Sequence, residues 1–335
     1  SLMYDYEIIL FSIDPIFELT DNIKTIQQNI IIKTSKQKLS NTKNKLLFIS
    51  VFFELLKLKK GFKPYVIHSH YATSYGLLGR MLFFDNFYLS VWGSDIFDFP
   101  LKSNIHKALI KFIFKGAKRI FSTSHVMAKE INKYTTKEVD IIPFGIDINQ
   151  FSPKESIDKG FVLGTVKSLE DIYGIDRLID VFDLVQKSIK DSICVIYGAG
   201  SKEEKLKLKV AELGLNSNVV FKGKISNKDV SKALSEMDVF CAFSRSESFG
   251  VAILEASSCS LPVVVTDVGG LPEVVLDNQT GFVCNYNKEK ISEKIIELYN
   301  KKELRVSFGK NGRKFVKDKF DWNKNIELMK ACYDQ

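Results

Sequence analysis

The chain has 335 residues, more than the roughly 250–300 over which one hydrophobic core grows, so two domains are expected. Its composition, 45% hydrophobic and 26% charged, indicates a soluble globular protein, and the net charge of +8 favours anionic partners. Five scattered cysteines without a CxxC pair argue against a zinc site and for a reducing compartment, and no apolar run reaches the ~20 residues of a membrane span.

Short β-rich runs alternate with helical segments through the first part of the chain. Strands are expected at 6–13, 29–35, 65–71, 88–93 and 119–124, and helices at 46–61 and 104–118. This alternation is typical of a parallel sheet with helices on both faces. We therefore expect a first α/β domain over residues 1–150.

Residues 139–160 combine two prolines with turn-formers and charges, which indicates an interdomain connection. Beyond it the alternation restarts. Strands are expected at 161–166, 192–200, 219–223, 239–244 and 262–267, and helices at 174–188, 202–214, 227–237, 251–259 and from residue 288 onward. This predicts a second α/β domain over 151–319, a final helix over 320–335 that returns to the first domain, and a ligand cleft between the domains.

The stretch "SRSESFGVAILEASS" follows a predicted buried strand and contains a predicted helix start near Gly250. Helix amino termini beyond the carboxyl ends of parallel strands carry unpaired N–H groups that suit a phosphate. The amides near Phe249, Gly250 and Val251 are therefore the candidate seat of a diphosphate.

Glu247 and Glu255 stand on either side of this helix start. An ionised carboxylate only accepts hydrogen bonds, and its two oxygens can accept from a vicinal diol. The pair can therefore bind hydroxyl groups on both sides of one diphosphate, as in a nucleotide sugar. Spacing alone equally fits an exposed loop glutamate and a helix glutamate of an ordinary α/β unit.

Four motifs together resemble the retaining glycosyltransferases of family 4, which have the GT-B fold. They are the Glu, seven residues, Glu pattern of 247–255 with Phe-Gly inside it, "PVVVTDVGGLPEVV" at 262–275, "IIPFGIDINQFSP" at 141–153 and "VIYGAG" at 195–200. The resemblance covers about residues 60–325. It implies two facing Rossmann-like domains, with Glu247 contacting the donor sugar, Glu255 the ribose, and the 249–251 amides the phosphates.

A departing diphosphate needs its charge stabilised by a metal or by cations. The chain has no Asp-x-Asp motif, so we expect no metal and no cofactor. Against the resembled family, Lys167 stands at an arginine position and Tyr173 at a lysine position. Lys167 keeps the charge without the bidentate fork. Arg245 is the candidate second cation; otherwise it is a surface charge or a partner of Glu247.

Gly198 and Gly200 read as a strand-to-helix turn that either binds the donor or is merely tight. The turn lacks the third glycine of a dinucleotide fingerprint, which disfavours a dehydrogenase. In the first domain, His70 is either an acceptor-side residue or a core histidine. Trp92 stands where the family often has histidine, and Asp95 is either a polar group near the reacting centre or a helix cap.

Two further expectations concern the start of the chain and its location. The chain reads as opening at the family's second strand, without the first strand and its glycine-rich loop. The basic, apolar helices at 46–63 and 104–118 either touch an anionic membrane or pack with a solvated lysine face. No nucleic-acid motif accompanies the positive charge.

The residues and the resemblance together therefore predict a metal-independent transferase in the cytoplasm, and the resemblance implies retention and a place peripheral to the plasma membrane. It would move a hexose from a nucleotide diphosphate sugar to a glycan or lipid-linked acceptor in envelope polysaccharide synthesis. Lys167 and the helix amides would stabilise the leaving diphosphate, and Glu247 would fix the sugar. A sugar-nucleotide epimerase of GT-B shape and a non-catalytic nucleotide-binding subunit are the alternatives. The base, the sugar and the acceptor stay open.

Overall fold

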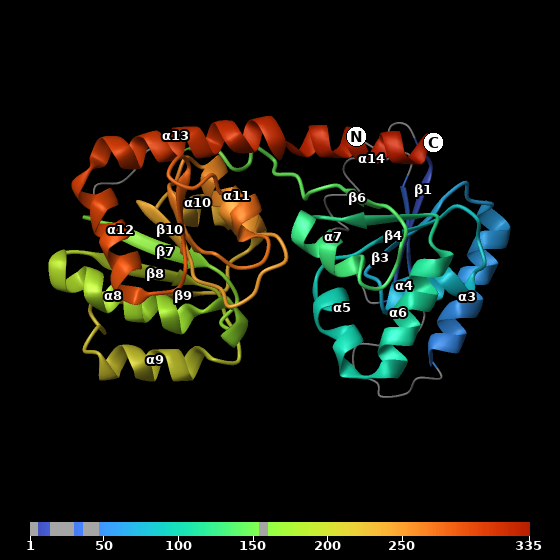
Figure 1. Ribbon diagram of the computed structural model, residues 1–335, viewed down its shortest axis with the longest axis horizontal. Helices are drawn as coiled ribbons and strands as arrows, with labels where there is room; N and C mark the ends of the chain where they lie inside the picture. Colours follow the sequence, from blue (N-terminus) through green and yellow to red (C-terminus); the bar gives the residue numbers. More distant parts are fainter. Residues whose placement is uncertain (1–5, 14–29, 36–46, 154–159) are drawn as a thin grey trace. The chain divides into compact units, whose positions relative to one another are not determined.

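The computed structural model describes residues 6–13, 30–35, 47–153 and 160–335. It consists of two compact units (Figure 1). Unit 1 comprises Ser1–Ser122, Glu130–Asp140 and Ile326–Gln335, and unit 2 comprises Thr123–Lys129 and Ile141–Asn325. Ile146 and Phe151, in the segment expected to connect two domains, are buried in the core of unit 2.

Unit 2 is built on one six-stranded sheet whose pairings are parallel and whose order is β12-β11-β10-β7-β8-β9. Its strands are β7 (Val162–Val166), β8 (Ile193–Tyr197), β9 (Val219–Gly223), β10 (Val239–Ala242), β11 (Val263–Thr266) and β12 (Gly281–Cys284). Its helices are α8 (Ile175–Ser188), α9 (Glu203–Glu212), α10 (Asn227–Leu234), α11 (Val251–Ser258), α12 (Lys288–Asn300) and α13 (Lys302–Lys319).

Successive residues of these strands pack into opposite hydrophobic clusters. Leu163 of β7 lies in a cluster with side chains of α8, α9 and α12, whereas its neighbour Val162 lies in a cluster with α10, α11 and α13. A strand that is apolar at every position is what a sheet buried on both faces requires. The apolar runs in the sequence therefore explain the helix–sheet–helix layering of this unit.

Unit 1 holds two sheets, β1-β2 and β3-β4-β5-β6. The strands are β1 (Ile8–Ser12), β2 (Ile30–Thr34), β3 (Ile67–His70), β4 (Phe87–Ser90), β5 (Arg119–Ser122) and β6 (Val139–Ile141). The helices are α3 (Leu47–Phe62), α4 (Ser74–Met81), α5 (Ser94–Phe97) and α6 (Asn104–Gly116). Two more helices, α7 (His125–Ile131) and α14 (Trp322–Tyr333), have residues in both units.

The end of α14 packs on the four-stranded sheet of unit 1. The hydroxyl of Tyr88 in β4 donates to the backbone oxygen of Cys332 at 3.2 Å, and the rings of Tyr88 and Tyr333 stack 5.9 Å apart. Among the described residues, no helix is both long and apolar enough to cross a bilayer. The expected α/β class, with two parallel-sheet halves, is confirmed.

Candidate functional site

The centre of the unit 2 sheet is a point where the strand order reverses. From β7 the chain adds β8 and β9 on one side, and then returns to place β10, β11 and β12 on the other. The loops after β7 and β10 therefore diverge. In open parallel sheets, ligands bind beyond the carboxyl ends of the strands at such a point. Lys167 is the first residue after β7, and Glu247 lies in the loop after β10.

Lys167 and Glu247 form an ion pair across this point. The Nζ of Lys167 lies 2.6 Å from Oε2 of Glu247, and the two side chains are only 12% and 13% exposed. The ammonium group also lies over the ring of Tyr173, 4.8 Å from its centroid. Because water screens the pair poorly at this depth, each charge requires the other or a ligand group. A ligand that carries both an anionic group and hydrogen-bond donors could therefore replace each partner of the pair.

The double glycine after β11 holds the loop that carries Glu247. Gly269 has a left-handed backbone (φ 52°), and a Cβ there would overlap the carbonyl oxygen of Glu247. A Cβ on Gly270 would meet the carbonyl oxygen of Ser248, and the Gly270 amide donates to the Glu247 oxygen at 2.9 Å. The two loops therefore touch backbone to backbone, an approach that only glycine permits.

We expect Gly269→Ala to lower the free energy of unfolding by about 1–3 kcal/mol more than Gly214→Ala. Both glycines have positive φ, so both substitutions strain the backbone. Only Gly269 has a backbone neighbour in the way, whereas nothing lies within 4 Å of a Cβ on Gly214. Urea unfolding of the two variants measures the difference; equal losses would show that the close approach contributes nothing.

Gly198 and Gly200 allow a close backbone approach to the loop that carries Lys167, as Gly269 and Gly270 do for the loop that carries Glu247. A Cβ on Gly198 (φ 145°) would overlap the carbonyl oxygen of Lys167, and one on Gly200 would meet that of Leu169. The Leu169 amide donates to the Ala199 oxygen at 3.1 Å. Both glycines therefore have a packing reason in the described structure, and their contact with a donor stays a prediction.

Helix α11 begins beside the ion pair. Gly250 precedes its first residue, Val251, with φ 120°, and no side chain caps the first turn. The Phe249 side chain is 3% exposed and packs in the core, so only its backbone can meet a ligand. Uncapped N–H groups at a helix start are electropositive. The helix starts where the sequence predicted, and the phosphate seat at 249–251 stays a prediction.

Glu255 lies one turn inside α11 and is half-buried. Burial raises the pKa of its carboxyl to about 7, and the nearby charge of Lys167 partly offsets this rise. A carboxyl whose pKa lies near neutrality takes up or releases a proton when a ligand arrives. Glu255 thus belongs to the same electrostatic cluster as Lys167.

Arg245 forms an ion pair with Asp176, and not with Glu247. Its Nη2 lies 2.6 Å from Oδ2 of Asp176, its Nη1 lies 2.8 Å from Oδ1, and Nη1 also donates to the Asp171 backbone oxygen at 2.7 Å. This bidentate pair raises the pKa of the Arg245 guanidinium and lowers that of the Asp176 carboxyl. Arg245 braces the start of α8, and its role as a second cation stays a prediction.

Sequence reasoning missed Arg177, in the first turn of α8. Its Nη1 lies 3.4 Å from the backbone oxygens of Phe243 and Ser244, and its guanidinium lies over the Tyr286 ring, 4.3 Å from the centroid. Arg177 therefore ties α8 to the segment that follows β10. The sequence signal that could have pointed to Arg177 is its position three residues after Gly174. In the structure, Gly174 has a φ of 63° and its backbone lies against the carbonyl oxygen of Phe243.

In unit 1 the three candidate residues lie at the end of β3 or in the segment after β4. His70 is exposed at the end of β3, and its ring centroid lies 5.7 Å from that of Trp92, which is 45% exposed. Asp95 is fully buried and accepts from the amides of Ala72 at 2.6 Å and Gly93 at 2.8 Å. These bonds hold the two loops together, although burial still raises the pKa of the Asp95 carboxyl. In this structure Asp95 thus positions loops, and contact with a reacting group stays a prediction.

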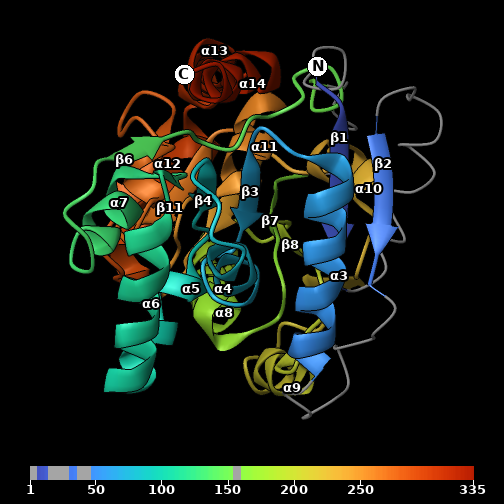
Figure 2. The same cartoon turned by 90° about the vertical axis from the view of Figure 1, so that its right-hand side faces the viewer.

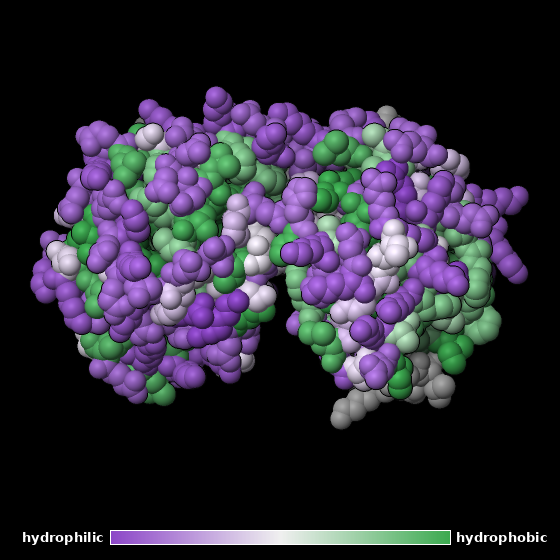
Figure 3. Space-filling model, viewed as in Figure 1, coloured by the Kyte–Doolittle hydropathy of each residue, from purple (hydrophilic) through white to green (hydrophobic). Residues whose placement is uncertain are grey.

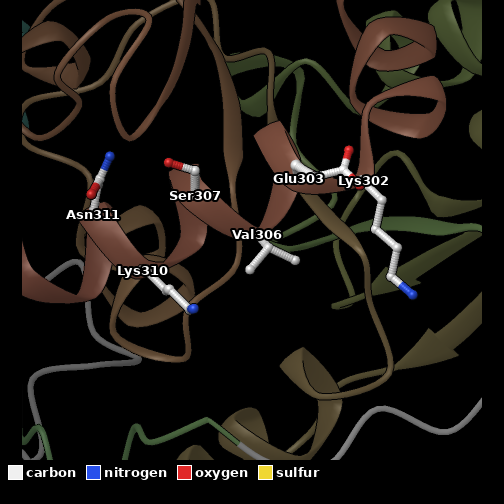
Figure 4. Close-up of a pocket in the computed structure, with 6 residues that line it drawn as sticks. All are labelled: Lys302, Glu303, Val306, Ser307, Lys310 and Asn311. Carbon is white, nitrogen blue, oxygen red and sulfur yellow. The ribbon is translucent and has the colours of Figure 1, made fainter.

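A shallow hollow of about 490 Å³ lies elsewhere, along α13 (Figure 4). All six lining residues belong to that one exposed helix: Lys302, Glu303, Val306, Ser307, Lys310 and Asn311. It has no opposing wall and includes no candidate residue, so we do not regard it as the site. In the described part of the chain, no three His, Cys, Asp or Glu side chains gather as a metal cluster.

Comparisons with known proteins identify matching families and relatives. The protein family described as "Glycosyl transferases group 1" matches residues 147–315, and the family "Glycosyl transferase 4-like" matches residues 4–124. An uncharacterized glycosyltransferase of Methanocaldococcus jannaschii, MJ1178, is 28% identical over 275 residues, which are 81% of this chain and 75% of that protein. The capsular polysaccharide biosynthesis glycosyltransferase CapM of Staphylococcus aureus is 32% identical over 198 residues, 57% of this chain and 51% of CapM.

The fold has a solved counterpart in Alr3699/HepE of Anabaena, in complex with UDP and glucose. The TM-score is 0.81 at 16% sequence identity, over 98% of this chain and 91% of that one. At this identity the likeness concerns the fold alone. Two parallel-sheet α/β halves with such counterparts make the fold GT-B, as the motifs predicted.

Proposed function

The chain belongs to the glycosyl transferases group 1 family, and on this premise we propose that it transfers a sugar from a nucleoside diphosphate sugar to a glycan or lipid-linked acceptor, with retention at the anomeric carbon. The observation that supports this proposal is the Lys167–Glu247 ion pair at the switch point of the unit 2 sheet. It brings a cation, a hydrogen-bond acceptor and an uncapped helix start to one place. A nucleoside diphosphate sugar carries the complementary groups.

Each group of the cluster has a role in this proposal. The diphosphate takes the ammonium of Lys167 and the first-turn amides of α11, and these stabilise the charge that develops on the leaving phosphate without a metal. Glu247, released from Lys167, accepts hydrogen bonds from the sugar hydroxyls. Glu255 accepts from the ribose hydroxyls. Retention follows from attack on the face that the diphosphate leaves, with the leaving phosphate taking the acceptor proton.

A titration tests the donor site, and a product assay tests the reaction. We expect one of the uridine, guanosine, adenosine and cytidine diphosphates to bind in EDTA, with a heat signal that Glu255→Ala weakens. With the matching nucleotide sugar, nucleoside diphosphate should be released only when acceptor is present. Conversion of the donor without acceptor would instead identify an epimerase, and failure of all four nucleotides to bind would contradict the donor site.

Nucleotide affinity should depend on pH through Glu255. Its carboxyl has a pKa of about 7 in the ligand-free protein and must lose its proton to accept from the ribose diol. We therefore expect affinity to fall by up to about tenfold for each pH unit below 7. Calorimetry between pH 5.5 and 8.5 measures this. Glu255→Gln should bind the nucleotide more weakly at pH 8, and its affinity should not show the pH dependence that the Glu255 carboxyl causes. The pH dependence that comes from the phosphate groups of the nucleotide should be the same in both proteins.

The same pKa predicts an opposite effect on stability. A carboxyl whose folded pKa is raised favours the folded state at low pH, and this contribution is lost as pH rises from about 4.5 to 7. Glu255→Gln should therefore be more stable than the parent at pH 8, by up to about 3 kcal/mol. A variant that binds worse and is also less stable would contradict the assignment, because it would indicate lost packing.

We also propose that unit 1 contacts an anionic membrane. Helix α6 exposes two apolar side chains, Ile105 (80%) and Phe112 (41%). The same helix exposes three lysines at four-residue spacing, Lys107, Lys111 and Lys115. Apolar side chains among lysines can enter the headgroup region while the lysines meet anionic lipid.

Ile105→Asp should reduce co-sedimentation with phosphatidylglycerol vesicles about tenfold or more, since a buried isoleucine contributes roughly 1.5–3 kcal/mol. Leu208→Asp is the matched control, because Leu208 is an exposed apolar residue (65%) on α9 of unit 2. Binding that is equal in all three proteins, or equal on neutral vesicles, would contradict the membrane contact.

A further inference from the structure

Residues Thr123–Lys129 belong to unit 2, although they follow β5 of unit 1 along the chain. They contain the start of α7, which is green in Figures 1 and 2. Their side chains and amides form hydrogen bonds with two segments of unit 2, the loop after β10, which carries Glu247, and the turn after β11, which carries Glu273. The start of α7 is therefore bonded to both loops that meet beside Glu247.

The hydroxyl of Ser124 forms the first of these bonds. Its Oγ donates to the carbonyl oxygen of Ser248 at 2.7 Å, and it accepts from the amide of Met127 at 3.3 Å. The second bond is that of a serine N-cap to the third residue of a helix. Ser124 is fully buried, so both bonds are shielded from water. This side chain thus fixes the backbone one residue beyond Glu247 to the first turn of α7.

The carboxylate of Glu273 forms the other two bonds. Its Oε2 accepts from the amide of His125 at 2.7 Å, and its Oε1 accepts from the amide of Val126 at 2.8 Å. The first amides of a helix have no acceptor within the helix, and they make its start electropositive, so a carboxylate suits them. Each oxygen of Glu273 has its own amide, and the side chain is therefore held in one orientation.

Together these bonds form a closed ring around the loop of Glu247. Glu273 ends a 3₁₀ turn that directly follows Gly270. The Gly270 amide donates to the carbonyl oxygen of Glu247, and the next carbonyl oxygen, that of Ser248, accepts from Ser124. The ring runs from Glu273 through Gly270 and the Glu247 loop to α7, and back to Glu273. The backbone of Glu247 can therefore move away only if one of these bonds breaks.

Capping of α7 alone does not require Glu273. The helix has seven residues and already has Ser124 as its N-cap, and His125 is exposed, so water can accept from its amide. A carboxylate from a distant loop adds what water cannot add, which is a fixed link between α7 and the turn after β11. This link is what the position of Glu247 depends on.

We propose that Glu273, assisted by Ser124, is a positioning residue for Glu247: the two side chains tie α7 to the loops after β10 and β11, and so hold Glu247 where it meets Lys167. The inference rests on the proposed function, in which Glu247 binds the donor sugar. Glu273 acts through the backbone, because two amides already occupy its carboxylate.

Hydrogen exchange of one amide tests the tie without any substrate. The Gly270 amide bonds across the two loops, so its exchange rate reports whether they separate. Glu273→Ala removes both bonds to α7. The matched control is Asp147→Ala in the same unit, because the carboxylate of Asp147 also accepts from two backbone amides, those of Asn149 at 2.9 Å and Gln150 at 3.1 Å. Glu273→Gln, which keeps one acceptor oxygen, is the milder second variant.

We expect the Gly270 amide to exchange at least tenfold faster in Glu273→Ala than in the parent or the Asp147→Ala control, with the amides of β8 unchanged. Glu273→Gln should change the rate in the same direction and by less. Equal Gly270 rates in all proteins would overturn the proposal. Faster exchange confined to the Ala128 amide, which bonds to the Ser124 oxygen within α7, would also overturn it, because Glu273 would then only cap the helix.

Kinetics tests the consequence for Glu247. We expect Glu273→Ala to lower kcat/KM for sugar transfer about tenfold, since a small misplacement of a binding group has effects of this order. Affinity for the bare nucleoside diphosphate should stay within about twofold, because that ligand lacks the sugar. Glu303→Ala controls for the loss of one carboxylate: Glu303 is exposed on α13, over which Figure 3 shows mostly hydrophilic surface.

A double variant shows whether Glu273 acts through Glu247. In a Glu247→Gln background, Glu273→Ala should lower kcat/KM by less than about twofold more, because a residue that only positions this carboxylate loses its effect when the carboxylate is gone. A full tenfold loss in both backgrounds would overturn the positioning role. If the parent protein transfers no sugar, the proposed function fails, whereas the exchange of Gly270 still shows whether Glu273 holds the loop.

Discussion

Replacing Lys167 with methionine is expected to lower kcat for sugar transfer about 100- to 1,000-fold, the loss typical of removing one preorganised electrostatic contact to a developing charge. Methionine keeps the unbranched apolar stem beside Tyr173 and removes only the ammonium group. Lys167→Arg should retain much of the activity, since it restores the charge. The rate of nucleoside diphosphate release at saturating donor and acceptor measures kcat.

Lys294→Met is the matched control. The Nζ of Lys294 lies 3.0 Å from Oε2 of Glu297 and 4.5 Å from the centroid of the Phe282 ring, so it has the same two kinds of partner as Lys167. Its helix, α12, carries no candidate residue. If Lys167→Met and Lys294→Met reduced kcat equally, the loss would reflect stability, and the catalytic role of Lys167 would be wrong.

Glu247→Gln is expected to lower kcat/KM about 100-fold, with little loss of affinity for the bare nucleoside diphosphate. Hydrogen bonds to a charged group contribute roughly 1.5–3 kcal/mol, which corresponds to about 10- to 150-fold. The bare nucleotide lacks the sugar hydroxyls that Glu247 is proposed to bind, so its affinity should change little. Steady-state kinetics and calorimetry with the nucleoside diphosphate separate the two effects.

Glu297→Gln removes a carboxylate that pairs with Lys294 and Lys301, and serves as the control for charge loss. The double variant Lys167→Met/Glu247→Gln adds a second test. Each single change leaves a poorly solvated charge without its partner, at a cost of about 1–3 kcal/mol, whereas the double change leaves none. The double variant should thus be more stable than either single variant, yet inactive. Activity in the double variant would contradict the site.

Regular secondary structure was largely predictable because it depends on local periodicity. The apolar run at 161–166 and the helix start at Gly250 both stand within two residues of the structure's β7 and α11. Two strands were not predicted. β6 lies inside the segment that its prolines marked as a connection, and β12 follows a turn-rich stretch. Both have four residues or fewer, and their pairing with a neighbouring strand, β5 or β11, rather than their own pattern makes them strands.

The site was predictable only as a set of residue types. The sequence suggested Lys167 and Glu247 separately, 80 residues apart, and it left Arg245 open as a second cation, a surface charge or a partner of Glu247. Strand order decides the pairing: β10 lies beside β7, so Glu247 meets Lys167, whereas Arg245 reaches Asp176 on α8. Which cation meets which carboxylate depends on backbone positions that local sequence does not encode.

For the glycines, too, the sequence indicated one thing and only the structure showed another. Their presence in "VIYGAG" and "VGGLPE" indicated turns, but the reason for each glycine lies in a carbonyl oxygen of another loop. The sequence by itself determined the alternation of strands and helices, the family, and the residue types available for an anion and for hydroxyl groups. Only the tertiary structure decided which loops touch and which charges pair, because these depend on contacts between segments far apart in the chain.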